Sequence, residues 1–271
     1  MNGASREALA AGRERLDALT DSTSADAARL ADELAAVTAL LDREVSLRRV
    51  LTDPAQSSEA KADLARRLLG TRVGGDTADL VSGLVRSRWS RGRDLVDALE
   101  QLADTADLTA AQRDGTLDDV EDELFRFGRI VASSPELRAA LTDREAPASA
   151  KAGLLGTLLG GRAKPGTERL VTRLVTAPRG RSLETGVESL SRLAAERRDR
   201  MVAVVTSAVP LSDPQKRRLG AALAGLYGRP LHLNLDVDPE VLGGIRVRVG
   251  DEVINGSIAD RIEAAGRRLA G

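Results

Sequence analysis

Residues 47–70 read LRRVLTDPAQSSEAKADLARRLLG, and residues 137–160 read LRAALTDREAPASAKAGLLGTLLG. Aligned at an offset of 90, the two stretches share 12 of 24 residues. Chance in so Ala- and Leu-rich a sequence would give roughly two or three. The correspondence extends back to Glu33, which aligns with Glu123. The N-terminal part of the chain is therefore predicted to contain an internal duplication, with copy one at residues 1–107 and copy two at residues 108–200.

Helical patterns flank the quoted stretch. Apolar residues recur at helical spacing and are interrupted by short Gly, Pro, Asp and Ser clusters, which is typical of amphipathic helices joined by short turns. Ser24 is the expected cap of the second helix, and Gly70 the expected end of the fourth. In copy one the pattern predicts six helices, at residues 5–20, 24–41, 46–51, 58–70, 76–87 and 91–106. Six such helices favour an antiparallel bundle.

The two copies are not equal in extent. Shifting the first helix by 90 places it on residues 95–110, which the last helix of copy one already occupies. Copy two is therefore expected to lack a first helix of its own. Residues 97–123 are strongly acidic, with Arg113 as their only basic residue. Such a run predicts an exposed connector between the copies and a candidate hinge.

The C-terminal part, residues 201–271, has a different pattern. Residues 201–208 are rich in Val, and apolar and polar residues alternate through 231–237 and 245–249, which predicts strands. Ser212 and Gln215 form a capping-box pair that begins an intervening helix. A short strand at Val253 and Ile254 and a closing helix capped by Ser257 complete the module. The predicted fold class is α+β and mostly α, with two related helical bundles in series followed by a small α/β module.

Composition excludes several classes of function. Lys and Arg number 40 and Asp and Glu 41, so the net charge of -1 gives no field for holding nucleic acid or an anionic membrane. The chain has no cysteine, which excludes disulfides and thiolate metal sites. Aromatic residues make up 1% of the chain, too few for stacking on bases. No apolar run has the length of a signal peptide or a membrane span.

Residues able to carry chemistry are sparse. His232 is the only histidine and falls on the polar side of a predicted strand, so a catalytic role is disfavoured. The acidic residues at 118–119 and 121–123 are consecutive on a predicted helix and point in different directions, which favours a solvated face over a metal site. Gly243 and Gly244 precede a strand, so they indicate a bulge and not a phosphate loop. The strongest basic patch comprises Arg86, Arg88, Arg91 and Arg93 around Trp89, repeated in part by Arg173, Arg179 and Arg181.

Residues 201–269 resemble the C-terminal part of the F-type ATP synthase delta subunit, the bacterial counterpart of the oligomycin-sensitivity-conferring subunit. Residues 1–106 are similar to the N-terminal six-helix bundle of that family, although Ser5 stands where an aromatic residue often occurs. The second copy is a departure and resembles the elongated form found in actinobacteria. The positions that carry the family signature are Pro239, Leu242, Gly243, Gly244, Ile245, Val247, Gly250, Asp251, Gly256 and Ser257.

The resemblance implies a non-catalytic stator subunit without cofactor or metal. It would be present once per complex, as a peripheral part of the ATP synthase on the cytoplasmic face of the plasma membrane, without membrane insertion or nucleic-acid binding. Its partners would be the N-terminal helices of alpha subunits and the b-type stalk subunits. The hypothetical groove for an alpha-subunit helix involves Leu9, Leu16, Leu80, Leu84 and Val85. The stalk is expected to contact Leu242, Ile258, Ile262 and Leu269.

Two other classes of function fit parts of the sequence. The internal repeat alone is compatible with a free-standing helical scaffold that binds partner helices. The acidic run at 97–123 could in principle serve a metal-dependent hydrolase, although a single histidine disfavours that interpretation.

Overall fold

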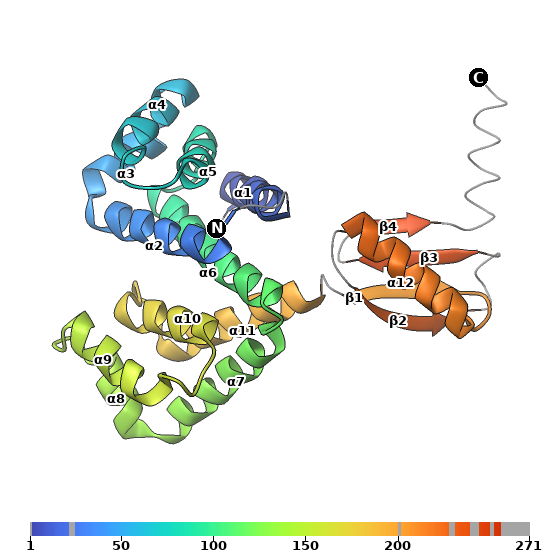
Figure 1. Ribbon diagram of the computed structural model, residues 1–271. Helices are drawn as coiled ribbons and strands as arrows, with labels where there is room; N and C mark the ends of the chain where they lie inside the picture. The colour runs from blue at the N-terminus through green and yellow to red at the C-terminus, as the bar shows by residue number, and fades with distance from the viewer. Residues whose placement is uncertain are drawn as a thin grey trace. The chain divides into compact units, whose positions relative to one another are not determined.

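The computed structural model describes residues 2–21, 25–199, 202–227, 231–238, 244–249 and 252–255. The chain divides into two compact units, Met1–Ala194 and Ala195–Gly271, called here the helical unit and the C-terminal unit (Figure 1). Ser24 and the predicted closing helix from Ser257 onward lie outside the described residues. Within the described residues, helices predominate and a small mixed sheet follows, which confirms the predicted fold class.

The helical unit repeats at the offset that the sequence indicates. Adding 90 to the bounds of α2 through α5 gives the bounds of α7 through α10 without deviation. The elements of copy one are α1 (Gly3–Asp21), α2 (Ala27–Arg43), α3 (Val45–Thr52), α4 (Ser58–Leu69), α5 (Gly75–Arg86) and α6 (Gly92–Arg113). Those that follow are α7 (Leu117–Ser133), α8 (Pro135–Thr142), α9 (Ala148–Leu159), α10 (Pro165–Thr176) and α11 (Leu183–Asp199).

Helix α6 belongs to both copies. It packs against α1, α2 and α5 of copy one and also against α7 and α10 of copy two. Shifting α1 by 90 places it at residues 93–111, inside α6. The last helix of copy one therefore occupies the position of a first helix for copy two. The helix ends at Arg113 with Asp114 as its cap; Gly115 follows with a φ of +67°, and the Thr116 N–H donates to the Ala111 carbonyl at 2.8 Å.

The predicted exposed connector at 97–123 is wrong. Helix α6 runs unbroken through residue 106 to Arg113, and its second half is almost entirely buried. Asp104 is 7% exposed and Asp107 is fully buried. Asp104 and Asp107 do not face water because arginines of copy two lie opposite them, which local charge alone does not reveal.

Equivalent glutamates fix the starts of equivalent helices. Glu33 Oε2 accepts hydrogen bonds from the Gly74 N–H at 2.9 Å and from the Thr77 hydroxyl, at the N-terminus of α5. Glu123 accepts the same pair of bonds from the Lys164 N–H at 2.9 Å and from Thr167, at the start of α10. Burial acts to raise the pKa of Glu33, but the bonds from Thr77, its partner Arg29 and Gly74 lower it overall.

The cores of both copies are aliphatic. The core of copy one includes five fully buried leucines, Leu16, Leu34, Leu84, Leu99 and Leu102. Gly12 of α1 lies so close to Leu84 and Leu102 that a Cβ would meet their methyl groups. In copy two the buried set includes Leu124, Leu141, Leu155, Leu170 and Val187. The cap of α2 is Asp26, whose Oδ1 accepts from the Arg29 N–H at 3.1 Å, and not Ser24 as predicted.

The C-terminal unit is a four-stranded sheet in the order β2-β1-β3-β4, with helix α12 (Asp213–Tyr227) against it (Figure 1). β1 (Val202–Ser207) is parallel to β2 (His232–Val237) and antiparallel to β3 (Ile245–Val249), which pairs with β4 (Glu252–Asn255). These bounds confirm the four predicted strands. Gln215 Oε1 accepts from the Ser212 N–H at 2.8 Å, so the predicted capping pair is also present. In the described part of the chain, no helix has the length and apolar content needed to cross a bilayer.

Candidate partner-binding surfaces

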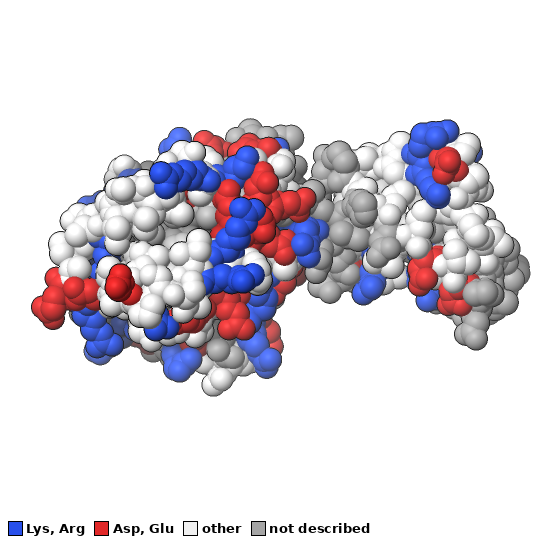
Figure 2. All heavy atoms as spheres, turned by 90° about the horizontal axis from the view of Figure 1, so that it is seen from below, with Lys and Arg blue, Asp and Glu red and all other residues white. Residues whose placement is uncertain are grey.

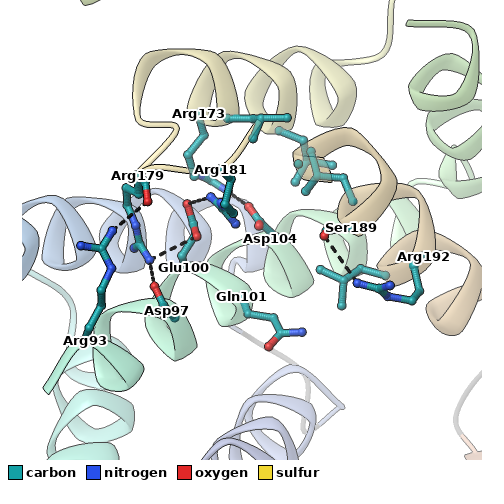
Figure 3. A pocket seen from close by; sticks show the side chains of 15 residues that line it. Arg93, Asp97, Glu100, Gln101, Asp104, Arg173, Arg179, Arg181, Ser189 and Arg192 are labelled. Carbon is teal, nitrogen blue, oxygen red and sulfur yellow. Dashed lines mark hydrogen bonds and ion pairs between the residues drawn. The ribbon is translucent and has the colours of Figure 1, made fainter. Parts of the chain in front are cut away.

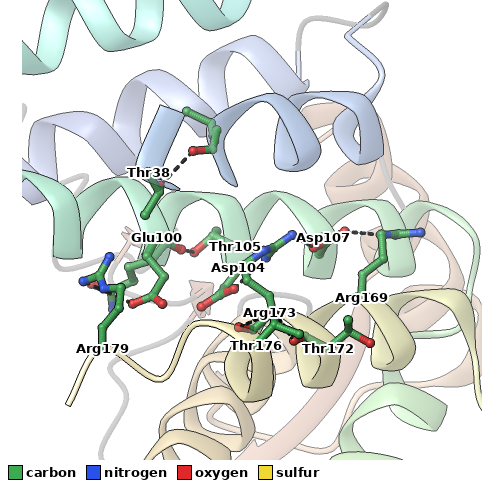
Figure 4. Close-up of polar contacts among 12 residues, drawn as sticks. Thr38, Glu100, Asp104, Thr105, Asp107, Arg169, Thr172, Arg173, Thr176 and Arg179 are labelled. Carbon is green, nitrogen blue, oxygen red and sulfur yellow. Dashed lines mark hydrogen bonds and ion pairs between the residues drawn. The ribbon is translucent and has the colours of Figure 1, made fainter. Parts of the chain in front are cut away.

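A layer of ion pairs joins α6 to copy two, and we call it the joint. Its acidic members, Glu100, Asp104 and Asp107, lie on one side of α6 because their spacing of four and three residues repeats along one helix face. Arg169 and Arg173 face them from α10, and Arg179 and Arg181 from the loop before α11. Figure 4 shows the acidic groups of α6 and the arginines converging between the two helices.

Arg173 is the central cation of the joint. Its Nη1 lies 2.7 Å from Asp104 Oδ1, and its Nη2 lies 2.7 Å from Asp107 Oδ2. Asp107 also accepts from Arg169 Nε at 2.5 Å. A planar guanidinium can satisfy two carboxylates at once, which a lysine ammonium could not do with the same geometry. Both carboxylates of the central pair are therefore matched by cations of copy two.

Arg179 and Arg181 hold the other end of the joint (Figure 3). Arg181 Nη2 donates to Glu100 Oε1 at 2.6 Å, while Arg179 pairs with Asp97 and lies 3.5 Å from Glu100 Oε2. The carbonyl of Arg179 accepts from Arg93 Nη2 at 2.8 Å. Arg179 has a φ of +51°, in the left-handed region that non-glycine residues rarely occupy. The contacts of its side chain and carbonyl offset that local strain, which costs on the order of 1 kcal/mol.

Burial perturbs the ionisation of this layer. Desolvation raises the pKa of Asp104 to about 7, against the attraction of Arg173 and with further repulsion from Glu100 and Asp107. Desolvation also acts to lower the pKa of Arg173, but the charges of Asp104 and Asp107 raise it overall. The joint is thus a set of charges whose stability depends on their mutual pairing.

A cavity of about 470 Å³ opens beside the joint, between α6, α10 and α11. Arg93, Arg192 and Ser189 line it together with members of the joint (Figure 3). On the face shown in Figure 2, basic and acidic side chains lie next to one another across the helical unit, and neither sign forms a patch by itself there. This pattern suits internal pairing of charges better than attraction of a highly charged ligand.

The residues predicted to line the alpha-subunit groove lie mostly inside the fold. Leu16, Leu80, Leu84 and Val85 are at most 1% exposed, and Leu9 is partly buried against the same core. All five belong to the core of copy one or pack against it, so they do not form an open surface. Any surface that a partner touches here consists of their exposed neighbours.

An open cavity of about 720 Å³ lies along the exposed side of α1. Ala4, Ala8 and Ala11 form its α1 wall, and Trp89 after α5 forms another part. Trp89 donates from its indole Nε1 to the Leu84 carbonyl at 2.9 Å and is 9% exposed, so it is packed in the wall and is not the centre of an exposed patch. The sequence did not reveal this cavity, because alanines at helical spacing are equally typical of a core.

Ser5 has a structural role at the same end of α1. Its hydroxyl donates to Asp94 Oδ2 at 2.8 Å and accepts from the Ser90 N–H at 2.9 Å. Asp94 is fully buried and is also paired with Arg91 Nη2 at 3.0 Å. Ser5 therefore ties α1 to the start of α6.

All four residues assigned to the stalk lie outside the described residues, namely Leu242, Ile258, Ile262 and Leu269. The same holds for the signature residues Pro239, Gly243, Gly250, Asp251, Gly256 and Ser257. Gly244 is described: it is exposed, directly precedes β3 and has a φ of +89°, a conformation that favours glycine. His232 falls within β2, and its side chain lies outside the description.

Three of the acidic residues considered for a metal have protein partners instead. Glu123 holds the start of α10, Asp119 lies 3.2 Å from Lys164 Nζ, and Asp122 pairs with Arg126. Within the ranges that the structure describes, no three His, Asp or Glu side chains gather as potential metal ligands. The acidic run is thus occupied by internal contacts, which weakens the interpretation as a hydrolase.

Comparison with known proteins adds the family context. The family model described as ATP synthase delta (OSCP) subunit matches residues 104–269. The match begins inside α6, so it includes copy two and the C-terminal unit and leaves most of copy one outside.

Several curated relatives match over the full length. The ATP synthase subunit delta of Streptomyces coelicolor is 80% identical over 270 residues, covering 100% of this chain and 98% of the relative. The subunit of the same name from Thermobifida fusca is 52% identical over 271 residues, covering 100% of both chains. A chain in a structure titled as the Toxoplasma gondii mitochondrial ATP synthase hexamer is similar with a TM-score of 0.33 and 23% identity, covering 62% of this chain and 95% of that chain. The family assignment rests on the sequence matches.

The raised pKa of Asp104 predicts a specific pH dependence of stability. Between the ordinary carboxyl value of 3.8 and the folded value of about 7, the folded state binds more protons than the unfolded state. The contribution of Asp104 to stability is therefore present at low pH and is lost as pH rises through about 7. Asparagine does not titrate, so the Asp104→Asn variant should lack this loss. The free energy of unfolding of the variant minus that of the wild type should therefore increase from about pH 5 to about pH 8.

Urea unfolding followed by far-ultraviolet circular dichroism at both pH values measures this difference. Asp122→Asn is the matched control, because Asp122 pairs with Arg126 at the exposed surface of α7, and it should follow the wild type. An identical change with pH in Asp104→Asn and the wild type would show that Asp104 does not titrate in this range.

Proposed function

The chain belongs to the ATP synthase delta (OSCP) subunit family, and from that membership we propose how its surfaces divide the work of the subunit. It is a non-catalytic stator subunit of F-type ATP synthase, part of the peripheral stalk that links alpha subunits to b subunits. The full-length identity of 80% to a subunit delta carries this conclusion. It replaces the interpretation as a free scaffold.

A stator must resist torque without performing chemistry. Resistance to torque requires a rigid structure. Close aliphatic packing and networks of buried ion pairs both make a fold rigid, and the helical unit has both. The proposed parts are residues 1–107, 108–200 and 201–271, with α6 shared between the first two. Because α6 spans the boundary between the first two parts, no loop separates the two copies.

We place the contact with an alpha-subunit helix along α1 and α5 of copy one. The spacing of these two helices would be set on their core side by Leu9, Leu16, Leu80, Leu84 and Val85. The exposed α1 side, with Ala4 and Ala11, would touch the partner, since small side chains allow a helix to approach closely. Support comes from the open cavity beside these alanines.

We place the contact with the b subunits on the C-terminal unit, through Leu242, Ile258, Ile262 and Leu269. The support is their apolar character and, for the last three, their spacing in the sequence, which fits one face of a helix. The ATP synthase complex is membrane-associated, and we further propose that this subunit lies on the cytoplasmic face of the plasma membrane.

Ala11→Gln tests the site for the alpha-subunit helix. The longer polar side chain would fill the cavity wall without disturbing the α1 core, so binding to the purified catalytic head should weaken at least about tenfold, or about 1.4 kcal/mol. Ala10→Gln is the matched control, since Ala10 is exposed and does not line the cavity. Equal binding by both variants would contradict the placement. Leu84→Asp would be uninformative, because it buries a charge in the core.

Ile262→Asp tests the stalk site. A carboxylate in an apolar helix–helix contact should remove the b subunits from an affinity purification while retaining alpha subunits, because the two contacts lie on different units of the chain. Retention of b at the wild-type level would refute the assignment of Ile262.

The proposed location makes a separate prediction. A protease-cleavable tag at the N-terminus should be cleaved in inverted membrane vesicles and protected in right-side-out vesicles. The reverse pattern of protection would overturn the cytoplasmic assignment.

A further inference from the structure

Helices α5 and α10 are equivalent in the duplication but differ where they meet α1 and α6. The bounds of the two helices differ by 90, and Leu84 of α5 matches Leu174 of α10. Where α5 has Gly83, however, α10 has Arg173. Glycine weakens a helix interior, and one use of it there is to let another backbone approach closely. The two copies therefore differ in the room that they leave beside this helix.

Gly83 is covered by the end of a flexible side chain. The three atoms nearest to a Cβ built at Gly83 all belong to Arg15 of α1. Arg15 is exposed, and exposed side chains change rotamer within nanoseconds. It lies four residues after Ala11, on the side of α1 that lines the open cavity. Turning Arg15 away would therefore extend the wall of small residues from Ala11 to Gly83.

Arg173 takes the place of Gly83 in copy two and is held from within the chain (Figure 4). Its side chain is 13% exposed and lies 2.7 Å from both Asp104 Oδ1 and Asp107 Oδ2. Turning Arg173 away would leave two buried carboxylates of α6 without this cation, which is strongly unfavourable. The joint therefore closes the surface between α6 and α10 to a partner.

The cavity along α1 has a counterpart in copy two that lacks a wall from a first helix. Lys61 lines the cavity of about 720 Å³, and its equivalent Lys151 lines a cavity of about 1090 Å³. Helix α1 contributes Ala8 and its neighbours to the first cavity, whereas α6, which is described in full, contributes no residue to the second. At the offset of 90, Ala8 corresponds to Ala98, which is fully buried in the core of copy one. Copy two thus has no free first-helix surface to offer.

We infer that each chain accepts one alpha-subunit helix, at copy one, and that the residue at positions 83 and 173 distinguishes the two copies. Gly83 leaves the surface between α1 and α5 open to a helix, and Arg173 uses the equivalent surface to join the copies. The inference rests on the proposed function, which places the contact on α1 and α5. It goes further in excluding copy two from the same task, so that the duplication lengthens the chain without adding a second site of this kind.

The binding ratio tests the inference directly. Native mass spectrometry of the full chain with an excess of a synthetic peptide, the N-terminal helix of the alpha subunit, should detect one bound peptide per chain. Isothermal titration calorimetry should give the same ratio. Two peptides per chain would overturn the inference while leaving the proposed contact at copy one intact. A wild-type chain that binds no peptide would reject the proposed contact itself, together with the inference built on it.

Gly83→Arg tests the role of position 83, since it gives copy one the side chain that copy two has. The peptide should bind at least about tenfold more weakly, because the new side chain occupies the surface beside α1. Gly153→Arg is the matched control: Gly153 is an exposed residue of α9 with nothing within 4 Å of a Cβ, so this variant should bind like the wild type.

Gly83→Ala guards against a folding defect, because its single methyl group would meet only the movable Arg15 side chain. This variant should keep the melting temperature of the wild type and bind the peptide severalfold more weakly. Wild-type affinity in both Gly83 variants would overturn the inference, since the bound helix would then lie elsewhere. Equal losses in Gly83→Arg and Gly153→Arg would also contradict it.

Discussion

The helical unit depends on the pairing between the acidic side of α6 and the arginines of copy two. One side of α6 supplies Leu99 and Leu102 to the core of copy one. Its other side presents Asp104 and Asp107, which are matched by Arg173. A single helix thus completes one bundle and begins the next, and no loop between them can bend. For a stator, that continuity transmits load from one bundle to the other.

Buried charge is an expensive way to join two bundles, since apolar contacts of the same size are often as stable. Its advantage in this protein is that ion pairs form only at one relative position of the two helices. Sliding α10 along α6 by one turn would leave buried carboxylates without cations, whereas an aliphatic contact tolerates such shifts more easily. The joint therefore fixes the register of the two copies, as well as contributing to their stability. Arg179 has a left-handed backbone conformation, and in this conformation its side chain pairs with Asp97 and Glu100.

Much of the fold was predictable because the duplication can be detected when the sequence is aligned with itself. The offset of 90 found between residues 47–70 and 137–160 recurs in the helix bounds, and Glu33 and Glu123 repeat their contacts. The acidic connector was misjudged because local composition does not reveal a partner some 70 residues away. The usable signal was the spacing of Glu100, Asp104 and Asp107 on one helix face, combined with Arg169 and Arg173 four residues apart. Likewise, apolar periodicity indicated that Leu16 and Leu84 contact other apolar groups. It did not show whether those groups belong to a partner protein or, as in the structure, to other helices of the same chain.

The central claim is that the joint makes the two copies one rigid body. Because the chain has no cysteine, spin labels can be attached at Arg67→Cys of α4 and Thr157→Cys of α9, which are exposed and equivalent in the duplication. Double electron–electron resonance should give a single narrow distance distribution in an otherwise wild-type chain and a broad one when Arg173→Met is added. A broad distribution without that substitution, or a narrow one that Arg173→Met leaves unchanged, would contradict the claim.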